Sequence, residues 1–158
     1  MHIAIVSDSH DNIKNFNKII DWLNAKNITT MLHCGDICNQ STINEATANF
    51  KGTLHFVRGN GDFELRQIPE NMELTLGGKK IFFNHYPDIA KTMAESGKYD
   101  LVFYGHTHRP WEEKVGNCRL INPGEVAGQR YKPTFAVYNT EHDALELKIL
   151  EKMELLDK

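Results

Sequence analysis

Seven side chains that can bind metal ions each follow closely after a predicted strand. They are two carboxylates, four imidazoles and one carboxamide: Asp8, His10, Asp36, Asn60, His85, His106 and His108. Hard oxygen and borderline nitrogen donors without a thiolate favour Mn, Fe, Ni, Co or Zn over a cysteine-rich structural zinc site. Seven ligands are too many for one tetrahedral ion, but they suit two ions that share a carboxylate and leave positions for water and substrate. The residue types therefore predict a dinuclear metal site.

The local spacing supports this interpretation. Glycine stands immediately before three of the seven residues, at Gly35, Gly59 and Gly105, where it permits a sharp turn and close backbone approach. His106 and His108 are two apart, so an extended chain places both rings on one face. Taken singly, each residue is as well explained as a helix cap or a turn residue. The prediction rests on the ordered set.

The first third of the chain predicts the elements that position three of these loops. Residues 3–6 form a continuous apolar run, typical of a strand that is covered on both faces. Further strands are predicted at 31–34 and 54–57, and a helix with one apolar face spans 13–23. A second helix is predicted to begin at a Ser41 or Thr42 cap, with Glu45 completing a capping box from Thr42, and to end near 50–52. This β-α-β-α-β order indicates a parallel sheet.

In the rest of the chain, the connections between predicted strands are shorter than in the first third. A hairpin joins 72–76 to 79–84 through Gly77-Gly78, and further strands are predicted at 101–104, 111–115, 119–121, 134–138 and 144–150. A helix is predicted at 88–96, and the chain ends in a charged segment that is either helical or frayed. The short turns favour a second, more antiparallel sheet. The expected fold is α/β, with two sheets packed together and helices outside.

Composition sets the broad class. The 158 residues, with 41% hydrophobic and 25% charged side chains, predict one globular domain spanning 1–158. A formal net charge of −3 and the lack of a Lys/Arg run argue against extended nucleic-acid binding. No signal peptide or membrane span is recognisable, so we expect a cytoplasmic protein without a membrane partner. Three cysteines predict a reducing compartment, with each thiol acting as a small buried hydrophobe.

The ordered motifs resemble a known family. Asp8-Ser9-His10, Gly35-Asp36, Gly59-Asn60, His85 and Gly105-His106-Thr107-His108 resemble the signature of the calcineurin-like metallophosphoesterases, most closely the small YfcE-like bacterial and archaeal phosphodiesterases. Asn122-Pro123-Gly124 and Arg130 also look like family features, so the resemblance spans nearly the whole chain. It implies a four-layer αββα sandwich of two packed mixed sheets with outer helices.

The resemblance also implies a division of the ligands. Asp8, His10, Asp36 and His108 would hold one ion, and Asp36, Asn60, His85 and His106 would hold the other, with Asp36 bridging. A hydroxide bridging the ions would attack the phosphorus, with Asp36 and Asn60 as the residues nearest the chemistry. The implied activity is a metal-dependent phosphodiesterase that acts on a small phosphodiester. Mn²⁺ or Ni²⁺ are the favoured ions, with Fe, Co, Zn or Mg as alternatives, and a homo-oligomer is left open.

Three positions depart from the family pattern. Gly61 stands where much of the superfamily has a histidine that assists the leaving group, and where YfcE-like members commonly have cysteine. Tyr86-Pro87 replaces a glycine and another histidine, and Glu125 stands where relatives often have serine. Because the histidine is absent, we expect a preference for substrates with good leaving groups, such as aryl phosphodiesters.

Other interpretations remain open at this stage. A phosphomonoesterase or nuclease of the same fold is one alternative, and a catalytically idle protein-binding scaffold like the retromer subunit is another. The complete set of seven ligands favours an enzyme, since a scaffold has no need of them. His33 is either a support for a metal ligand or a simple buried histidine. Arg58, Arg66, Arg109 and Arg130 either meet a phosphate or form surface ion pairs.

Overall fold

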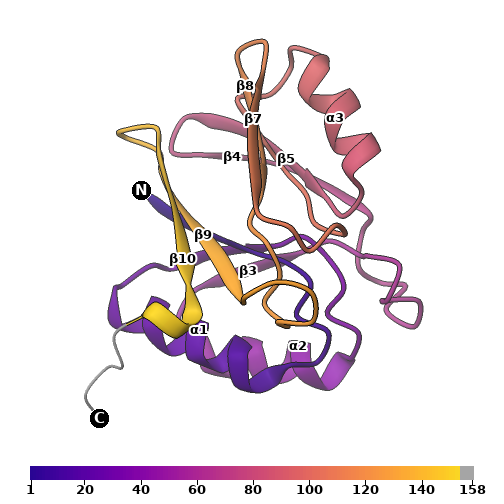
Figure 1. The fold of residues 1–158 in the computed structure, drawn as a ribbon, viewed down its shortest axis with the longest axis vertical. Coiled ribbons are helices and arrows are strands. Elements are labelled where there is room, and N and C mark those ends of the chain that lie inside the picture. The colour runs from indigo at the N-terminus through magenta and orange to yellow at the C-terminus, as the bar shows by residue number, and fades with distance from the viewer. Residues whose placement is uncertain (154–158) are drawn as a thin grey trace.

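The structure is a computed structural model, and it describes residues 1–153. Within this range ten strands form two five-stranded sheets (Figure 1). The first sheet has the order β10-β9-β1-β2-β3, with β1 His2–Val6, β2 Thr30–His33, β3 Thr53–Phe56, β9 Thr134–Asn139 and β10 Ala144–Ile149. The second has the order β4-β5-β6-β8-β7, with β4 Asn71–Leu76, β5 Lys79–Asn84, β6 Leu101–Phe103, β7 Trp111–Val115 and β8 Cys118–Asn122.

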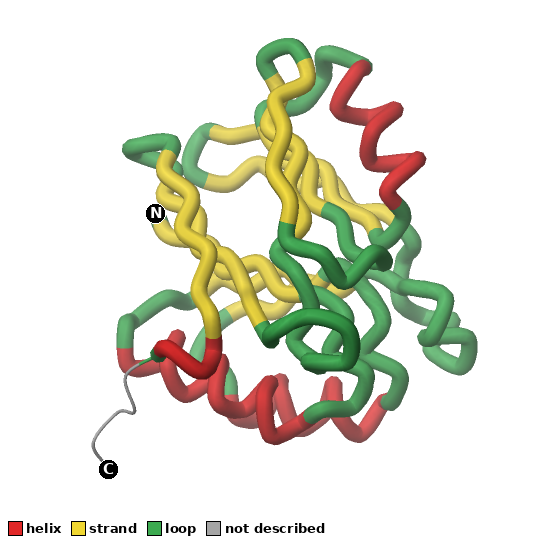
Figure 2. Tube along the Cα trace, viewed as in Figure 1, coloured by secondary structure: helices red, strands yellow, loops and turns green. Residues whose placement is uncertain are grey.

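Helices cover the outer faces of the two sheets (Figure 2). α1 (Ile13–Ala25) and α2 (Gln40–Asn49) lie against the first sheet, and α3 (Pro87–Glu95) lies against the second. α1 buries Phe16, Ile19, Ile20 and Leu23, which repeat at the spacing of one helix face. A separate apolar cluster fills the space between the sheets, with Phe83, Phe103 and Tyr138 among its largest members. The predicted α/β sandwich of two packed mixed sheets is confirmed.

The assignment of the last hairpin to a more antiparallel second sheet was wrong. β9 pairs antiparallel with β1, so the β9–β10 hairpin extends the first sheet. Each sheet then contains two parallel and two antiparallel pairings. Short turns specify only that β9 pairs with β10. Which sheet the hairpin joins depends on contacts between distant segments. On β9, Phe135 packs toward the helices and Tyr138 packs between the sheets.

The start of α2 also differs from the prediction. Asn39 caps the helix, and its side chain accepts a hydrogen bond from the Ser41 N–H at 2.9 Å. The predicted capping box does not form. The Thr42 hydroxyl instead donates to Asp11 at 2.9 Å, which ties the helix to the loop after β1. Asparagine caps a helix as well as serine or threonine does, and Asn39 takes the position that was predicted for Ser41 or Thr42.

The ends of the chain follow the predicted pattern as far as they are described. A 3-10 turn, Leu150–Lys152, follows β10, and most of the charged terminal segment, residues 154–158, lies outside the described residues. In residues 1–153, no helix is both long and apolar enough to cross a membrane. The assignment of the whole chain to one domain and to the cytoplasm stays a prediction.

Candidate metal centre

All seven predicted ligands lie in the loops after β1, β2, β3, β5 and β6. Hydrogen bonds join these loops within each sheet and between the two sheets. The Asp8 N–H donates to the Gly35 carbonyl at 2.9 Å, and the Gly105 N–H donates to the His85 carbonyl at 3.2 Å. The His106 N–H donates to Asp8 Oδ2 at 3.1 Å and thereby links the first sheet to the second. The structure therefore brings the predicted residues together at one end of the sandwich.

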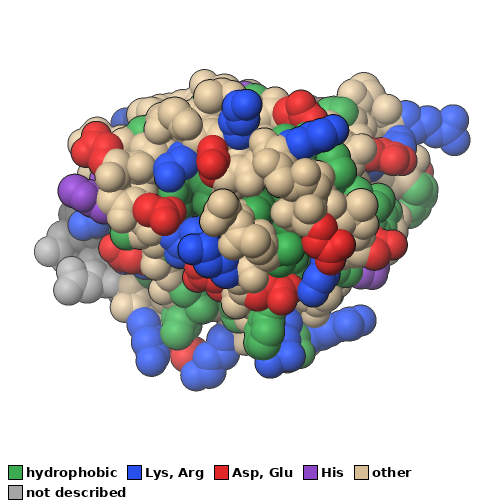
Figure 3. All heavy atoms as spheres, turned by 90° about the horizontal axis from the view of Figure 1, so that it is seen from above, with side chains coloured by type: hydrophobic (Ala, Val, Ile, Leu, Met, Phe, Trp, Pro, Cys, Tyr) green, Lys and Arg blue, Asp and Glu red, His purple; other side chains and the backbone are tan. Residues whose placement is uncertain are grey.

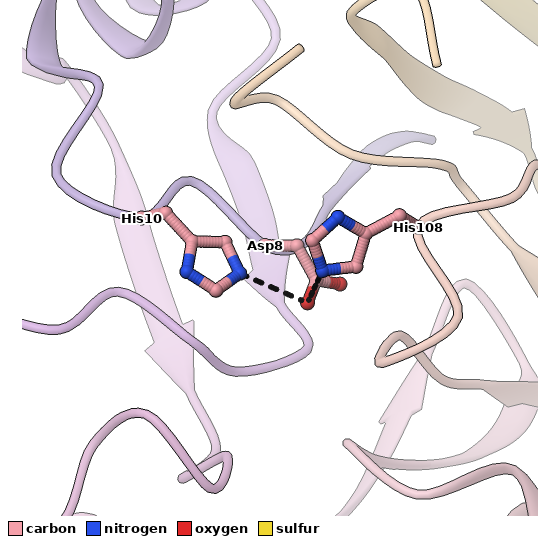
Figure 4. Close-up of side chains that lie close together, drawn as sticks. All are labelled: Asp8, His10 and His108. Carbon is pink, nitrogen blue, oxygen red and sulfur yellow. Dashed lines mark ion pairs between the residues drawn. The ribbon is translucent and has the colours of Figure 1, made fainter. Parts of the chain in front are cut away.

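Asp8, His10 and His108 form the first group of donor atoms (Figure 4). Nε2 of His10 lies 3.6 Å from Asp8 Oδ1, and Nε2 of His108 lies 3.3 Å from the same oxygen. The two imidazole rings have centroids 5.0 Å apart and are tilted by 41°. One carboxylate oxygen and two ring nitrogens thus face a common point, as in a site for a borderline divalent ion.

Asp36 connects this group to a second one, formed by Asp8, Asp36 and His85. Its Oδ2 lies 3.5 Å from His10 Nε2 and 3.4 Å from His85 Nε2. Nδ1 of His85 donates to the Cys34 carbonyl at 2.8 Å, which leaves the Nε2 lone pair directed toward Asp36. Asp36 therefore occupies a bridging position between the two groups.

Asn60 and His106 extend the second group toward solvent. Asn60 Oδ1 lies 3.0 Å from His85 Nε2 and 3.1 Å from His106 Nδ1, and the two imidazole nitrogens are 3.3 Å apart. Asn60 and His106 are exposed, whereas Asp8, Asp36 and His85 are buried. The donor cluster is therefore open on the Asn60 side, where a substrate can approach.

Two atoms at the centre of the cluster are placed to bind a cation. Asp8 Oδ1 and His10 Nε2 are buried and have no hydrogen-bond partner among residues 1–153, because their 3.6 Å separation is too long for a hydrogen bond. Leaving such groups unsatisfied costs about 1–3 kcal/mol each, and more when charged. Carboxylate and imidazole donors directed at a shared point would be satisfied by a divalent ion. The residues present therefore fit the implied metals.

The backbone of these loops is bent into an uncommon conformation. Asp8, His10, Asp36, His106 and His108 have φ angles of 53°, 42°, 61°, 71° and 64°. Left-handed backbone costs an L-residue roughly 1–2 kcal/mol, and such residues concentrate at functional sites. A side-chain carbon at Gly59 would overlap Asp36 Oδ1, and one at Gly105 would overlap the Ser7 hydroxyl. The predicted role of glycine in allowing close approach therefore agrees with the geometry.

Proximity of opposite charges shifts the pKa values within the cluster. Burial raises the pKa of Asp8, but His10, His85, His108 and the Ser7 hydroxyl outweigh it and hold the pKa below the usual value. The Asp8 carboxylate facing its Nε2 raises the pKa of His10 to about 10. The metal-free cluster therefore keeps a proton on His10, and a cation that binds there must displace it.

Asp62 was not predicted to contribute, yet its buried carboxylate holds two ligand loops together. Its Oδ2 accepts from the N–H groups of Asp36 and Gly59, both at 2.8 Å, and its Oδ1 accepts from the Cys38 N–H at 2.6 Å. The only signal for this role in the sequence was its place in the turn that follows Asn60. Acidic side chains in turns commonly bind backbone N–H groups, but rarely across two loops.

His33 proves to be a support between ligand loops. The Gly35 N–H donates to its Nδ1 at 3.1 Å, so Nε2 carries the proton and donates to the Ser9 hydroxyl at 3.0 Å. Burial lowers the pKa of His33 to about 3, which keeps the ring neutral. The ring thereby connects the loop after β1 to the loop after β2.

Cys38 and Tyr86 lie beside the cluster, and Cys38 differs from the sequence interpretation. Cys38 was predicted to be a buried hydrophobe, but it is half-buried and its Sγ lies 3.7 Å from His10 Nδ1. Tyr86 places its ring edge-on to His85, with centroids 5.1 Å apart, and 5.7 Å from the His106 ring. Cys38 thus supports a ligand, and Tyr86 forms an aromatic wall beside the second group.

Two of the four arginines form local contacts. Arg58 pairs with Glu70 at 2.8 Å, and the Arg109 guanidinium lies 4.8 Å from the centroid of the Trp111 ring. These contacts favour the surface interpretation for both residues. On the face of the molecule in Figure 3, basic and acidic side chains are interspersed.

Comparison with known proteins agrees with the geometry. The profile of the calcineurin-like phosphoesterase superfamily domain matches residues 1–143. Phosphodiesterase MJ0936 of Methanocaldococcus jannaschii is 32% identical over 167 residues, which cover 96% of this chain and 100% of the relative. A solved structure of an archaeal phosphodiesterase matches with a TM-score of 0.88 and 30% identity, over 94% of this chain and 99% of the other.

More distant solved structures show the fold alone. YfcE, a phosphoesterase from E. coli, matches with a TM-score of 0.67 and 18% identity, over 95% of this chain and all of the other. Vps29 of Chaetomium thermophilum matches with a TM-score of 0.76 and 18% identity, over 94% of both chains. The profile match and the 32% identical relative establish the family, and the chain belongs to the calcineurin-like phosphoesterase superfamily.

Proposed function

We propose that the protein is a metal-dependent phosphodiesterase acting on a small phosphodiester. The observation that carries the proposal is the bridging position of Asp36, whose Oδ2 lies 3.5 Å from His10 and 3.4 Å from His85. The fit of the unpartnered Asp8 oxygen to a cation supports it. Relatives described as phosphodiesterases, at 30–32% identity, point to the same activity.

Each residue has a role that follows from its place. Asp8, His10 and His108 would hold one divalent ion, and His85, Asn60 and His106 would hold the other, with Asp36 shared. When bound, two such ions lower the pKa of a water nucleophile and offset the charge of the phosphoryl oxygens. The hydrogen bonds from His85 to Cys34 and from His33 to Ser9 keep the ligand loops in place before substrate arrives.

Charge is consistent with an anionic small-molecule substrate. Two divalent ions would bring the formal net charge of −3 to about +1, or to about 0 with a bridging hydroxide, and would place positive charge at the open side of the cluster. The formal net charge of −3 of the metal-free chain offers no bulk positive charge to bind a long polyanion. We therefore favour a small diester over a nucleic-acid polymer, with Mn²⁺ or Ni²⁺ as the ions.

The first prediction tests this activity directly. We expect protein stripped with EDTA to be inactive on bis(p-nitrophenyl) phosphate and to regain activity with Mn²⁺ or Ni²⁺. Asp36→Asn removes the shared ligand and should lower the restored rate at least about 100-fold, more than is usual for outer-shell residues. The matched control, Asp21→Asn on the exposed face of α1, should keep the wild-type rate.

The same assay separates the alternatives. Faster hydrolysis of p-nitrophenyl phosphate than of the diester would replace the diesterase with a phosphomonoesterase. Inactivity with every ion, together with equal metal content in wild type and Asp36→Asn, would instead favour a catalytically idle protein-binding scaffold.

A further inference from the structure

Glu125 is a fully buried carboxylate beside the candidate metal centre. A charged side chain is rarely buried completely unless it is paired. Both oxygens of Glu125 have partners: Oε2 accepts from His108 Nδ1, and Oε1 accepts from the Arg130 N–H at 2.9 Å. Since both oxygens are used in this way, Glu125 acts through His108 and is not itself a ligand.

The contact with His108 determines which ring nitrogen faces the cluster. Because Nδ1–H donates to Glu125, the lone pair of Nε2 is directed at the first group, 3.3 Å from Asp8 Oδ1. A carboxylate behind an imidazole also makes the other nitrogen a stronger donor to a metal ion. The His85 ring has a neutral backbone carbonyl, that of Cys34, in the same position. His108 of the first group therefore has a charged partner at Nδ1, and His85 of the second group has a neutral one.

The backbone around Glu125 is hydrogen-bonded to the loop after β1 that carries Asp8. The Val126 N–H donates to the Ser7 carbonyl at 3.0 Å, and the Ala127 N–H donates to the Asp8 carbonyl at 3.1 Å. The Thr134 N–H donates to the Glu125 carbonyl at 2.9 Å. Glu125 and Asp8 are thus held in fixed relation, with His108 between their carboxylates.

From this geometry we propose that Glu125 is a positioning residue that fixes His108 and gives the Asp8/His10/His108 group the tighter of the two metal sites. The inference rests on the proposed function, because it assumes that the cluster holds two divalent ions. A residue that only braced the 128–133 loop through the Arg130 N–H would affect both sites equally. Metal affinities measured at both sites therefore distinguish the positioning of His108 from the bracing of the 128–133 loop.

The test combines metal binding with NMR on Glu125→Gln and Glu125→Ser. Calorimetric titration of the metal-free wild type with Mn²⁺ should resolve two ions of unequal affinity. We expect Glu125→Gln, which keeps the shape and an acceptor oxygen, to weaken the tighter ion about 10-fold. Glu125→Ser, which is too short to reach the ring, should weaken it about 100-fold, with the second ion changed less than about twofold.

The spectroscopic readout uses protein loaded with diamagnetic Zn²⁺. In the wild type, the hydrogen bond to Glu125 should give His108 a slowly exchanging Nδ1–H resonance. The resonance should shift in Glu125→Gln and exchange too fast to be seen in Glu125→Ser. Glu141→Gln, at an exposed position in the β9–β10 turn, is the matched control and should change neither readout.

Several outcomes would overturn the proposal. Equal weakening of both ions, unchanged affinities in Glu125→Gln, or a rapidly exchanging Nδ1–H in the wild type would each exclude the positioning role. If Glu125→Ser fails to fold, Glu125→Gln decides alone. A wild type that binds two ions yet hydrolyses neither ester would refute the proposed function separately, since neither readout here measures activity.

Discussion

Gly61 shows how a single residue of this chain differs from the family pattern. The resemblance leads us to expect histidine or cysteine at this position, and in the structure a neighbouring thiol lies against the vacant space. A side-chain carbon at Gly61 would be 3.2 Å from Cys38 Sγ and 3.1 Å from Asp36 Oδ1. The Gly61 N–H meanwhile donates to that Asp36 oxygen at 2.7 Å. A larger residue at 61 therefore requires Asp36 Oδ1 and the Cys38 thiol to shift by a few tenths of an ångström.

This geometry changes how the leaving-group prediction must be tested. Gly61→His alone should place the ring against Cys38, whereas Gly61→His combined with Cys38→Ala should make room for it. If leaving-group protonation is what the chain lacks, the double variant should raise the rate on alkyl phosphodiesters relative to aryl ones about 100-fold, the lower end of general-acid catalysis. Measuring this ratio in all three variants tests the idea, with Cys38→Ala expected not to raise it. An unchanged ratio in the double variant would contradict it.

At the scale of elements, the loops after β1 and β2 act as one unit. Besides joining Ser9 to Gly35, the ring of His33 packs edge-on against Phe16 of α1, with centroids 5.6 Å apart, and 5.8 Å from Phe56 of β3. A strand end, a helix and a neighbouring strand therefore depend on the same neutral imidazole. This dependence makes the stability of the unit sensitive to acid.

The pKa of His33 gives the sign and the pH range of that effect. Because burial holds the pKa at about 3, below the ordinary value of 6.5, the unfolded chain takes up this proton first as the pH falls. The stabilisation is complete above pH 6.5 and is lost progressively toward pH 3. In metal-free protein, we expect the free energy of unfolding of wild type relative to His33→Gln to fall by about 2 kcal/mol between pH 7 and pH 5.

Urea unfolding at the two pH values measures this difference. The same substitution at exposed His142, in the β9–β10 turn, is the control and should give a nearly constant difference from wild type. A pH-independent difference for His33→Gln would show that the ring titrates normally in the folded state.

At the scale of the whole molecule, the site exists because two sheets face each other with the ends of their parallel strands on the same side. Asp8, Asp36 and Asn60 come from one sheet, and His85 and His108 come from the other. Away from the site, Arg119 of β8 joins the sheets. It donates to Glu112 at 2.6 Å within its own sheet and to Asp143, in the turn between β9 and β10, at 2.9 Å.

Arg119 should therefore contribute more to stability than an exposed ion pair does. Its guanidinium also lies 5.7 Å from the centroid of the Tyr138 ring, whose hydroxyl donates to Asp143 at 2.6 Å. We expect Arg119→Ala to lower the free energy of unfolding by about 1–2 kcal/mol. Lys132→Ala, which breaks an exposed pair with Glu151, should cost less than about 0.5 kcal/mol. Equal effects in urea unfolding would argue against a bridging role for Arg119.

The sequence predicted those features that depend on neighbouring residues. The sequence correctly predicted the apolar face of α1 and the hairpin at Gly77-Gly78. Both predictions depend on residues that lie close together in the chain. The seven candidate ligands could also be proposed from the sequence, since each follows the end of one of five strands. The strand order in the first sheet was not predicted, because the pairing of β9 with β1 joins residues more than 130 apart in the chain.

The sequence by itself determined the kinds of ligand, their order and the strands that carry them, because side-chain chemistry and hydrophobic periodicity are local properties. Only the tertiary structure decided how those ligands are oriented. Glu125 behind His108, Cys38 beside His10 and Asp62 across two loops are contacts between distant segments. No local pattern encodes them, because each arises only when neighbouring strands of one sheet pair and bring loops with left-handed backbone to one place.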